Sequence, residues 1–103
     1  MIFLLVAVVV ASADARCAAR VGFYQPPEGI VSTAQSAARV AEIYLTRTYG
    51  APVIRGELPF KVRLDRGVWT IEGKDLPLGW EGGVAELQIC RSNGLVLRVV
   101  HGK

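Results

Sequence analysis

The residues that could hold a metal ion are few and far apart in this chain of 103 residues. A metal site needs several histidine, cysteine or carboxylate ligands brought together. The chain has one histidine, His101, two residues before its end, and two cysteines, Cys17 and Cys90. A lone histidine at such a position is typical of an exposed or capping side chain. The sequence therefore predicts no metal site and no cofactor.

Nucleophilic and acid–base catalysis also find little support. A nucleophile needs a neighbouring base that a third group orients, but Ser32 and Ser92 occupy positions typical of a helix cap and a turn. Glu72 and Glu86 could face each other on two strands, yet both fall on polar faces of alternating segments, which is typical of solvated surface. The glycine-rich residues 79–83 lack the Gly-Lys-Ser/Thr ending of a phosphate-binding loop. We predict that the protein is not an enzyme.

The first residues have the character of an export signal. Residues 2–11 are uninterrupted and apolar, too short to span a bilayer comfortably, and two overlapping small-x-small patterns end at Ala13 and Ala15. No lysine or arginine precedes this run. The alternative interpretation is a buried amino-terminal strand. We expect residues 1–15 to be a signal peptide, the mature protein to be periplasmic or secreted, and no stable membrane span to remain after cleavage.

Composition and charge narrow the class of partner. Hydrophobic residues make up 51% of the chain and charged residues 20%, which excludes a disordered or fibrous protein. The net charge of +3 is spread without a basic stripe, so nucleic acid is not a predicted partner. In an oxidising compartment Cys17 and Cys90 could form a disulfide that pins the amino-terminal segment to a strand. The alternative is two free thiols.

The elements that must position these residues follow from hydrophobic periodicity. Residues 16–31 are linker-like, and residues 33–49 have the 3.6-residue period of an amphipathic helix with an alanine-rich stripe. Ser32 is the predicted N-cap, with Gln35 three residues later. Gly50 followed by proline predicts the end of the helix.

The second half of the chain alternates with period two. Four apolar–polar alternating runs predict two β-hairpins, the first turning at Asp65-Arg66-Gly67 and the second at Asn93-Gly94. Trp69 follows the alternation and is predicted to lie in the core. We therefore expect residues 32–103 to form an α+β domain, with one long amphipathic helix packed on a curved four-stranded antiparallel sheet.

Short motifs spread over the last 70 residues support a family resemblance. The pieces, in order, are Pro59-Phe60-x-Val62, Gly67-Val68-Trp69-x-Ile71-x-Gly73, Leu76-Pro77, Gly82-Gly83-Val84-Ala85, Gly94-x-Val96-Leu97 and His101-Gly102-Lys103. Together they resemble the bacterial immunity proteins of polymorphic toxin systems that have a nuclear transport factor 2-like (cystatin-like) fold. The resemblance implies a curved sheet cradling the helix and a role in neutralising a cognate toxin protein without catalysis.

Six residues are candidates for contact with a partner. Trp80 and Glu81 lie in a glycine-flanked loop, where an exposed tryptophan would be a typical interface anchor. The other candidates are Asp65 and Arg66 in a hairpin turn, and His101 and Lys103 at the carboxyl terminus. The leading hypothesis is an immunity protein acting in the cell envelope. The alternative is a periplasmic cystatin-like binding module for a peptide, lipid or protease.

Overall fold

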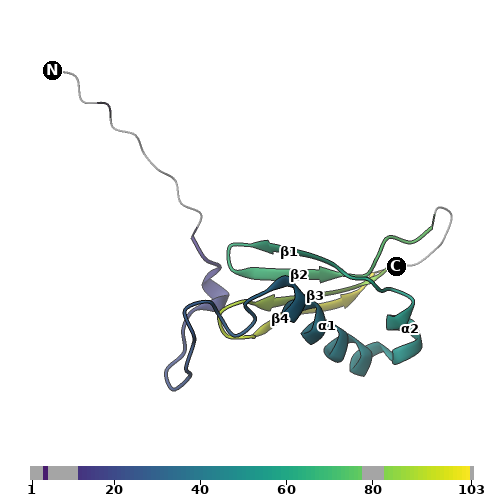
Figure 1. Cartoon of the computed structure of the whole chain (residues 1–103), viewed down its shortest axis with the longest axis horizontal. Coiled ribbons are helices and arrows are strands. Elements are labelled where there is room, and N and C mark those ends of the chain that lie inside the picture. The colour runs from purple at the N-terminus through teal and green to yellow at the C-terminus, as the bar shows by residue number, and fades with distance from the viewer. Residues whose placement is uncertain (1–3, 5–11, 78–82, 103) are drawn as a thin grey trace.

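The computed structural model describes Leu4, residues 12–77 and residues 83–102, and it shows the predicted α+β architecture, with a long helix lying against one face of a four-stranded sheet (Figure 1). Among the described residues, no helix has the length and apolarity needed to cross a membrane. The elements in chain order are η1 (Ala15–Cys17), α1 (Ala34–Tyr49), α2 (Ala51–Arg55), β1 (Lys61–Asp65), β2 (Val68–Glu72), β3 (Ala85–Cys90) and β4 (Val96–His101).

Helix α1 begins one residue later than predicted. Thr33, not Ser32, is the N-cap, and its hydroxyl accepts a hydrogen bond from the Ser36 backbone N–H at 3.0 Å. The Ser36 hydroxyl in turn accepts from the Thr33 N–H at 3.1 Å. Ser36 therefore completes the capping box in place of the predicted Gln35, because its short hydroxyl reaches back over the first turn.

The buried stripe of α1 is narrower than its periodicity suggests. Ala37, Ala41 and Leu45 have no exposed surface, whereas Tyr44, which the periodicity places on the same face, is 42% exposed. The small alanines let the helix lie close to the sheet, and α1 packs across β1, β2 and β3.

A second helix follows α1 at once and was not predicted. Gly50 has φ of +96° and ends α1, and the backbone then turns into α2 with a proline in its first turn. Proline is well suited to the first turn of a helix, so the Gly-x-Pro sequence here both ends one helix and begins the next. The short α2 buries Ile54 in the main core.

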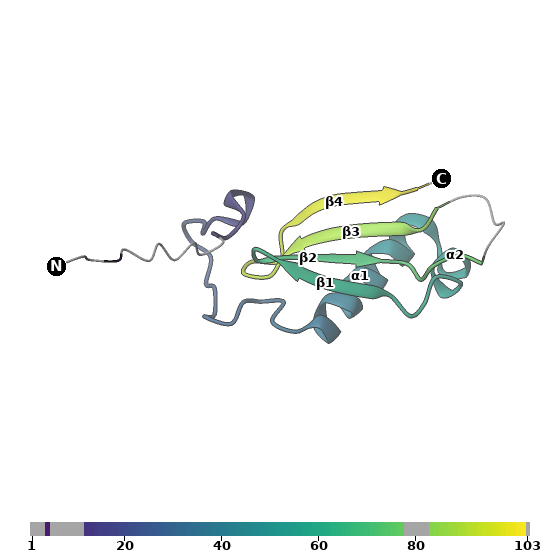
Figure 2. The same cartoon turned by 90° about the horizontal axis from the view of Figure 1, so that it is seen from above.

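The sheet has the simple order β1-β2-β3-β4, all antiparallel, and it is open at both edges (Figure 2). The two hairpin turns match the prediction. Arg66 and Gly67 have φ of +48° and +80°, the left-handed pair that a tight turn between twisted strands requires, and Gly94 has φ of +73°.

A β-bulge in β4 changes which side chains face α1. Gln88 pairs with Arg98 while Ile89 pairs with Val96, so Leu97 is an extra residue on β4. Val96 and Val99 consequently pack on the helix side, whereas Leu97 packs on the opposite face. Strict alternation along this run would place Leu97 and Val99 on the same face, and the bulge puts them on opposite faces.

The core lies between α1 and the sheet. Trp69 is 7% exposed, as predicted, and its indole N–H donates to the Val31 carbonyl at 2.7 Å. Leu64, across from it on the edge strand β1, is 42% exposed. The helix-side face is therefore well covered over the central strands and open towards the edge.

Candidate functional site

The predicted site residues do not come together in one place. The β1–β2 turn, with Asp65 and Arg66, lies at the end of the sheet where the β3–β4 turn also lies, called here the turn end (Figure 2). His101 lies at the opposite end of the sheet, where β4 finishes. Trp80, Glu81 and Lys103 lie outside the described residues.

The amino-terminal segment is attached to the turn end. Cys17 and Cys90 form a disulfide, with their Cα atoms 5.5 Å apart, and with Val68 they make a small second core on the face of the sheet opposite α1. The Asp14 backbone N–H donates to the Arg66 carbonyl at 2.8 Å. Residues 14–17 are therefore joined to both hairpins in the full chain. Cleavage after Ala13 would keep the contacts of Asp14, whereas cleavage after Ala15 would remove them and leave the disulfide.

An ion pair inside this segment adds to its order. Hydrogen bonds from Arg16, through its guanidinium at 2.8 Å and its backbone N–H at 2.9 Å, lower the pKa of Asp14 from 3.8 to about 2. Because the folded-state pKa is lowered, this stabilisation is present at neutral pH. It starts to be lost as the pH falls below 3.8 and is gone below about 2.

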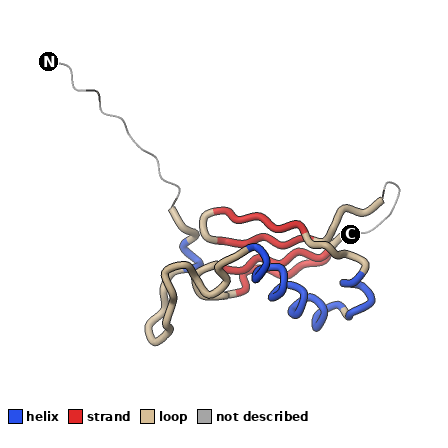
Figure 3. The backbone as a smooth tube through the Cα atoms, viewed as in Figure 1, coloured by secondary structure: helices blue, strands red, loops and turns tan. Residues whose placement is uncertain are grey.

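Residues 18–30, called here the arm, form a long loop between η1 and α1 (Figure 3). At the last residue of the arm, the backbone N–H of Ile30 donates to the Ser92 carbonyl at 3.1 Å. The backbone N–H of the next residue, Val31, donates to the Arg91 carbonyl at 3.0 Å. Gly29 has φ of +92°, and a Cβ there would collide with the Arg91 carbonyl. The arm is thus held at both ends on the turn end of the sheet.

The arm exposes large apolar side chains almost completely. Val21 is 102% exposed, Phe23 69% and Tyr24 82%. The sequence predicts a linker here, since the region has neither helical nor strand periodicity. The signal that could have indicated it was the run of apolar and aromatic residues beside Pro26-Pro27, which is unusual in a solvated linker.

The charges near the arm are mixed, with three arginines, Arg20, Arg66 and Arg91, and two exposed carboxylates, Glu28 and Asp65. Arg20 and Arg66 are exposed and Arg91 is half-buried, and within the described part of the chain none of the three makes a salt bridge. A hollow of about 250 Å³ lies between the arm and the β3–β4 turn. The side-chain amide nitrogens of Gln25 and Asn93, which line it, are buried and have no acceptor among the described residues.

At the opposite end of the sheet, His101 is bonded to a buried carboxylate that the sequence analysis missed. Glu57 is 5% exposed. One of its oxygens accepts from the Ala85 backbone N–H at 2.6 Å, and the other lies 3.2 Å from His101 Nε2. His101 Nδ1 lies 3.1 Å from the Gly102 carbonyl, and its ring lies 5.1 Å from that of Tyr49.

This pair ties elements together. Both ring nitrogens of His101 and both carboxylate oxygens of Glu57 lie within hydrogen-bonding distance of a partner. Glu57 follows α2, so its bonds join the helical layer to β3 and β4. No sequence pattern pointed to it, because it lies between α2 and β1 outside any periodic segment.

Glu57→Ala is expected to lower the free energy of unfolding by about 2 kcal/mol, since the buried Ala85 N–H would lose its acceptor. Urea denaturation followed by tryptophan fluorescence measures this change. Glu42→Ala, on the exposed face of α1, is the matched control and should change stability by less than about 0.5 kcal/mol. Equal effects of the two substitutions would mean that the Glu57 bonds add nothing to the stability of the fold.

The carboxylates considered for acid–base work form ion pairs on the open face of the sheet. Glu72 and Glu86 are cross-strand neighbours, as predicted. Glu72 pairs with Arg63 at 2.7 Å and Glu86 with Arg98 at 3.2 Å. Each carboxylate has its own cation, so this row is a polar surface ladder.

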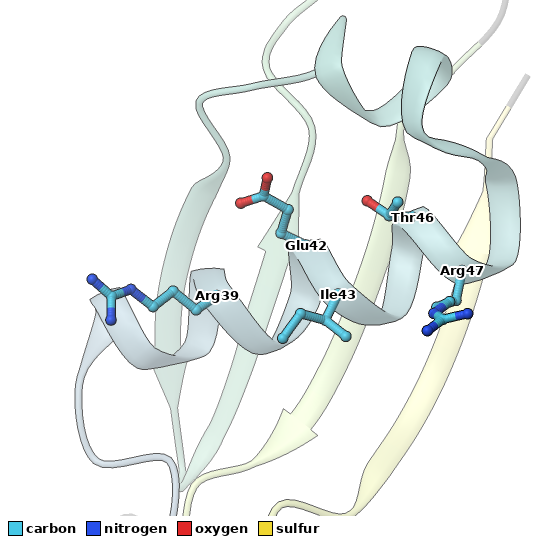
Figure 4. Close-up of a pocket in the computed structure, with 5 residues that line it drawn as sticks. All are labelled: Arg39, Glu42, Ile43, Thr46 and Arg47. Carbon is cyan, nitrogen blue, oxygen red and sulfur yellow. The ribbon is translucent and has the colours of Figure 1, made fainter.

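The outward face of α1 carries an open hollow of about 460 Å³ (Figure 4). Arg39, Ile43 and Arg47 follow one another along it at four-residue spacing, and Ile43 is 68% exposed. All the lining residues belong to one convex helix, so no second wall encloses a ligand. Across the described residues, no group of three or more histidine, cysteine or acidic side chains is placed to hold a metal ion.

Comparison with known proteins gives two matches. Residues 36–103 match the family model described as NTF2 fold immunity protein. The Escherichia coli K12 protein named "Uncharacterized protein YbbC" is 36% identical over 73 residues, which cover 71% of this chain and 60% of that protein. The chain thus spans well under two thirds of the length of this relative. No solved structure matches the chain.

Proposed function

Because the chain belongs to the NTF2 fold immunity protein family, whose general role is to neutralise a toxin, we propose that it binds one cognate toxin of a polymorphic toxin system and blocks it without catalysis. The observation that carries the proposal is the match over residues 36–103, which include α1, α2 and the whole sheet. The described fold agrees with that family.

The arrangement of polar groups supports a binding role. The buried Glu57 and its partner His101 are occupied by mutual and backbone contacts, and Glu72 and Glu86 are neutralised by arginines. A general acid or base must be free to reach a substrate proton. These groups are arranged to hold strands together, which suits a protein that works through its surface.

We place this action in the cell envelope. The apolar residues 2–11 have the character of a secretory signal, and the disulfide between Cys17 and Cys90 is of a kind that persists mainly in oxidising compartments. The toxin would then act on an envelope target such as peptidoglycan or the membrane, and the immunity protein would meet it there.

If the proposal is right, a toxin gene should lie beside this one, and co-expression of this chain with that toxin domain is expected to restore growth of a sensitive strain. The toxin domain is directed in turn to the periplasm and to the cytoplasm, and each form is combined with the full chain or with a variant lacking residues 2–13. The full chain should protect against the periplasmic toxin, and the shortened variant should not.

Two other outcomes separate the parts of the proposal. If neither form protects against either toxin, neutralisation of this toxin is wrong. If only the shortened variant protects, and only in the cytoplasm, the envelope location is wrong. With purified proteins, inhibition should be complete at equal amounts of the two chains, whereas inhibition by a small fraction of an equivalent would contradict a binding mechanism.

A further inference from the structure

The arm lies outside the part of the chain that the family shares. The family match begins at residue 36, inside α1, while the arm covers residues 18–30. The matched region already contains most of α1, all of α2 and all four strands, so the arm lies outside the elements that the family shares. Its exposed apolar side chains need another explanation.

We infer that the arm is the surface by which this protein selects its toxin, with Phe23 and Tyr24 entering an apolar pocket whose rim is acidic. The inference rests on the toxin-binding function proposed above and adds the contact surface and the chemistry of the partner. Three observations carry it, namely exposure, attachment at both ends, and charge.

Exposing the apolar side chains of the arm to water is unfavourable in free energy unless a partner covers them. Phe23 and Tyr24 are adjacent, each at least 69% exposed, and Val21 beside them is fully exposed. Aromatic side chains bury large areas and are enriched at protein interfaces and among the residues that dominate binding. Their position on one projecting loop suits insertion into a concave site.

The attachment at both ends reduces the entropic cost of binding. The disulfide at Cys17 holds the segment before the arm, and the hydrogen bonds of Ile30 and Val31 hold its far end. Pro26 and Pro27 restrict the backbone between them. A loop ordered before it meets its partner loses less freedom on binding, which raises affinity.

The charges beside the arm specify the rim of the partner's pocket. Arg20, Arg66 and Arg91 make no salt bridge with any described residue, so a partner's carboxylates can pair with them. They outnumber the two acidic residues of this region that also make no salt bridge within the described part of the chain, Glu28 and Asp65. This excess of positive charge matches a partner that brings carboxylate oxygens, and opposite charges speed association.

The test compares paired variants by calorimetry or surface binding, using as the probe the purified toxin domain against which the wild-type chain protects in the co-expression experiment above. Phe23→Ala combined with Tyr24→Ala is expected to weaken binding by at least about 30-fold. The matched control, Tyr44→Ala, removes an exposed tyrosine from α1 and should change affinity less than about threefold. Arg20→Glu should weaken binding more than Arg39→Glu, and the difference should shrink as salt is added.

All the substituted side chains are exposed, so each variant should fold, and an unchanged melting temperature checks this. Folded arm variants that bind the toxin like the wild type would overturn the inference. So would a result in which the arm variants lose only self-association, or only binding to anionic phosphatidylglycerol vesicles, and keep toxin affinity. If the wild-type chain itself fails to bind the toxin, the proposed function has failed, not the assignment of the arm alone.

Discussion

Reduction of the Cys17–Cys90 disulfide is expected to lower the free energy of unfolding by about 4 kcal/mol. The bond joins residues separated by 73 positions. A cross-link of this span removes many conformations from the unfolded chain, and the chain-entropy relation gives a stabilisation of this size for a loop of this length. The effect is a large part of the roughly 5–15 kcal/mol that stabilises a typical domain.

Urea denaturation with and without a thiol reductant measures the change. The control is the variant with both Cys17→Ser and Cys90→Ser, which should be as unstable as the reduced wild type and insensitive to reductant. A wild-type protein whose urea midpoint does not move after complete reduction would show that the bond does not stabilise the fold.

The same reduction should loosen the arm more than the sheet. Cys17 is the covalent attachment before the arm, while the main core between α1 and the strands contains neither cysteine. Hydrogen exchange in the reduced protein should therefore rise first in residues 14–31. The chain would be most stable in an oxidising compartment, which agrees with the proposed envelope location.

The sequence predicted the elements well because each has one dominant period. The 3.6-residue repeat of residues 33–49 predicted α1, and the alternation of four short runs predicted the strands. The exact first residue of a helix depends on which of two neighbouring residues becomes the N-cap. Ser32 and Thr33 are both capable caps, and only the folded backbone decides that Thr33 and Ser36 form the box.

Features without a period were missed. The bulge at Leu97 inserts one residue without any turn signal, and α2 contains in its first turn the proline that predicted the end of a helix. Proline ends one helix as readily as it begins the next, so sequence alone does not separate the two cases.

The candidate site was hard to predict because hairpin topology, not distance along the chain, decides what is close. Asp65 and Arg66 lie at the turn end with the arm, whereas His101 lies at the other end beside Glu57. Nothing in the sequence distinguishes a loop that is fixed at both ends from a flexible linker. That distinction came from two backbone hydrogen bonds and a disulfide.

Leu45→Ala is expected to lower the free energy of unfolding by about 3 kcal/mol. Leu45 has no exposed surface, and the other fully buried residues of α1 are the alanines Ala37 and Ala41. Truncating it removes the largest fully buried side chain of α1 and leaves a cavity, because the two alanines cannot fill the space.

The matched control is Ile43→Ala, two residues away on the same helix. Ile43 loses a similar number of carbon atoms but is 68% exposed, so its change should stay below about 0.5 kcal/mol. Urea denaturation at neutral pH compares the two variants, and similar midpoints would mean that α1 does not depend on Leu45 for docking. Because Leu45 and the disulfide belong to separate clusters, their effects should add to about 7 kcal/mol in a reduced Leu45→Ala protein. That sum is comparable with the whole stability of a domain, so the reduced variant should be largely unfolded at room temperature.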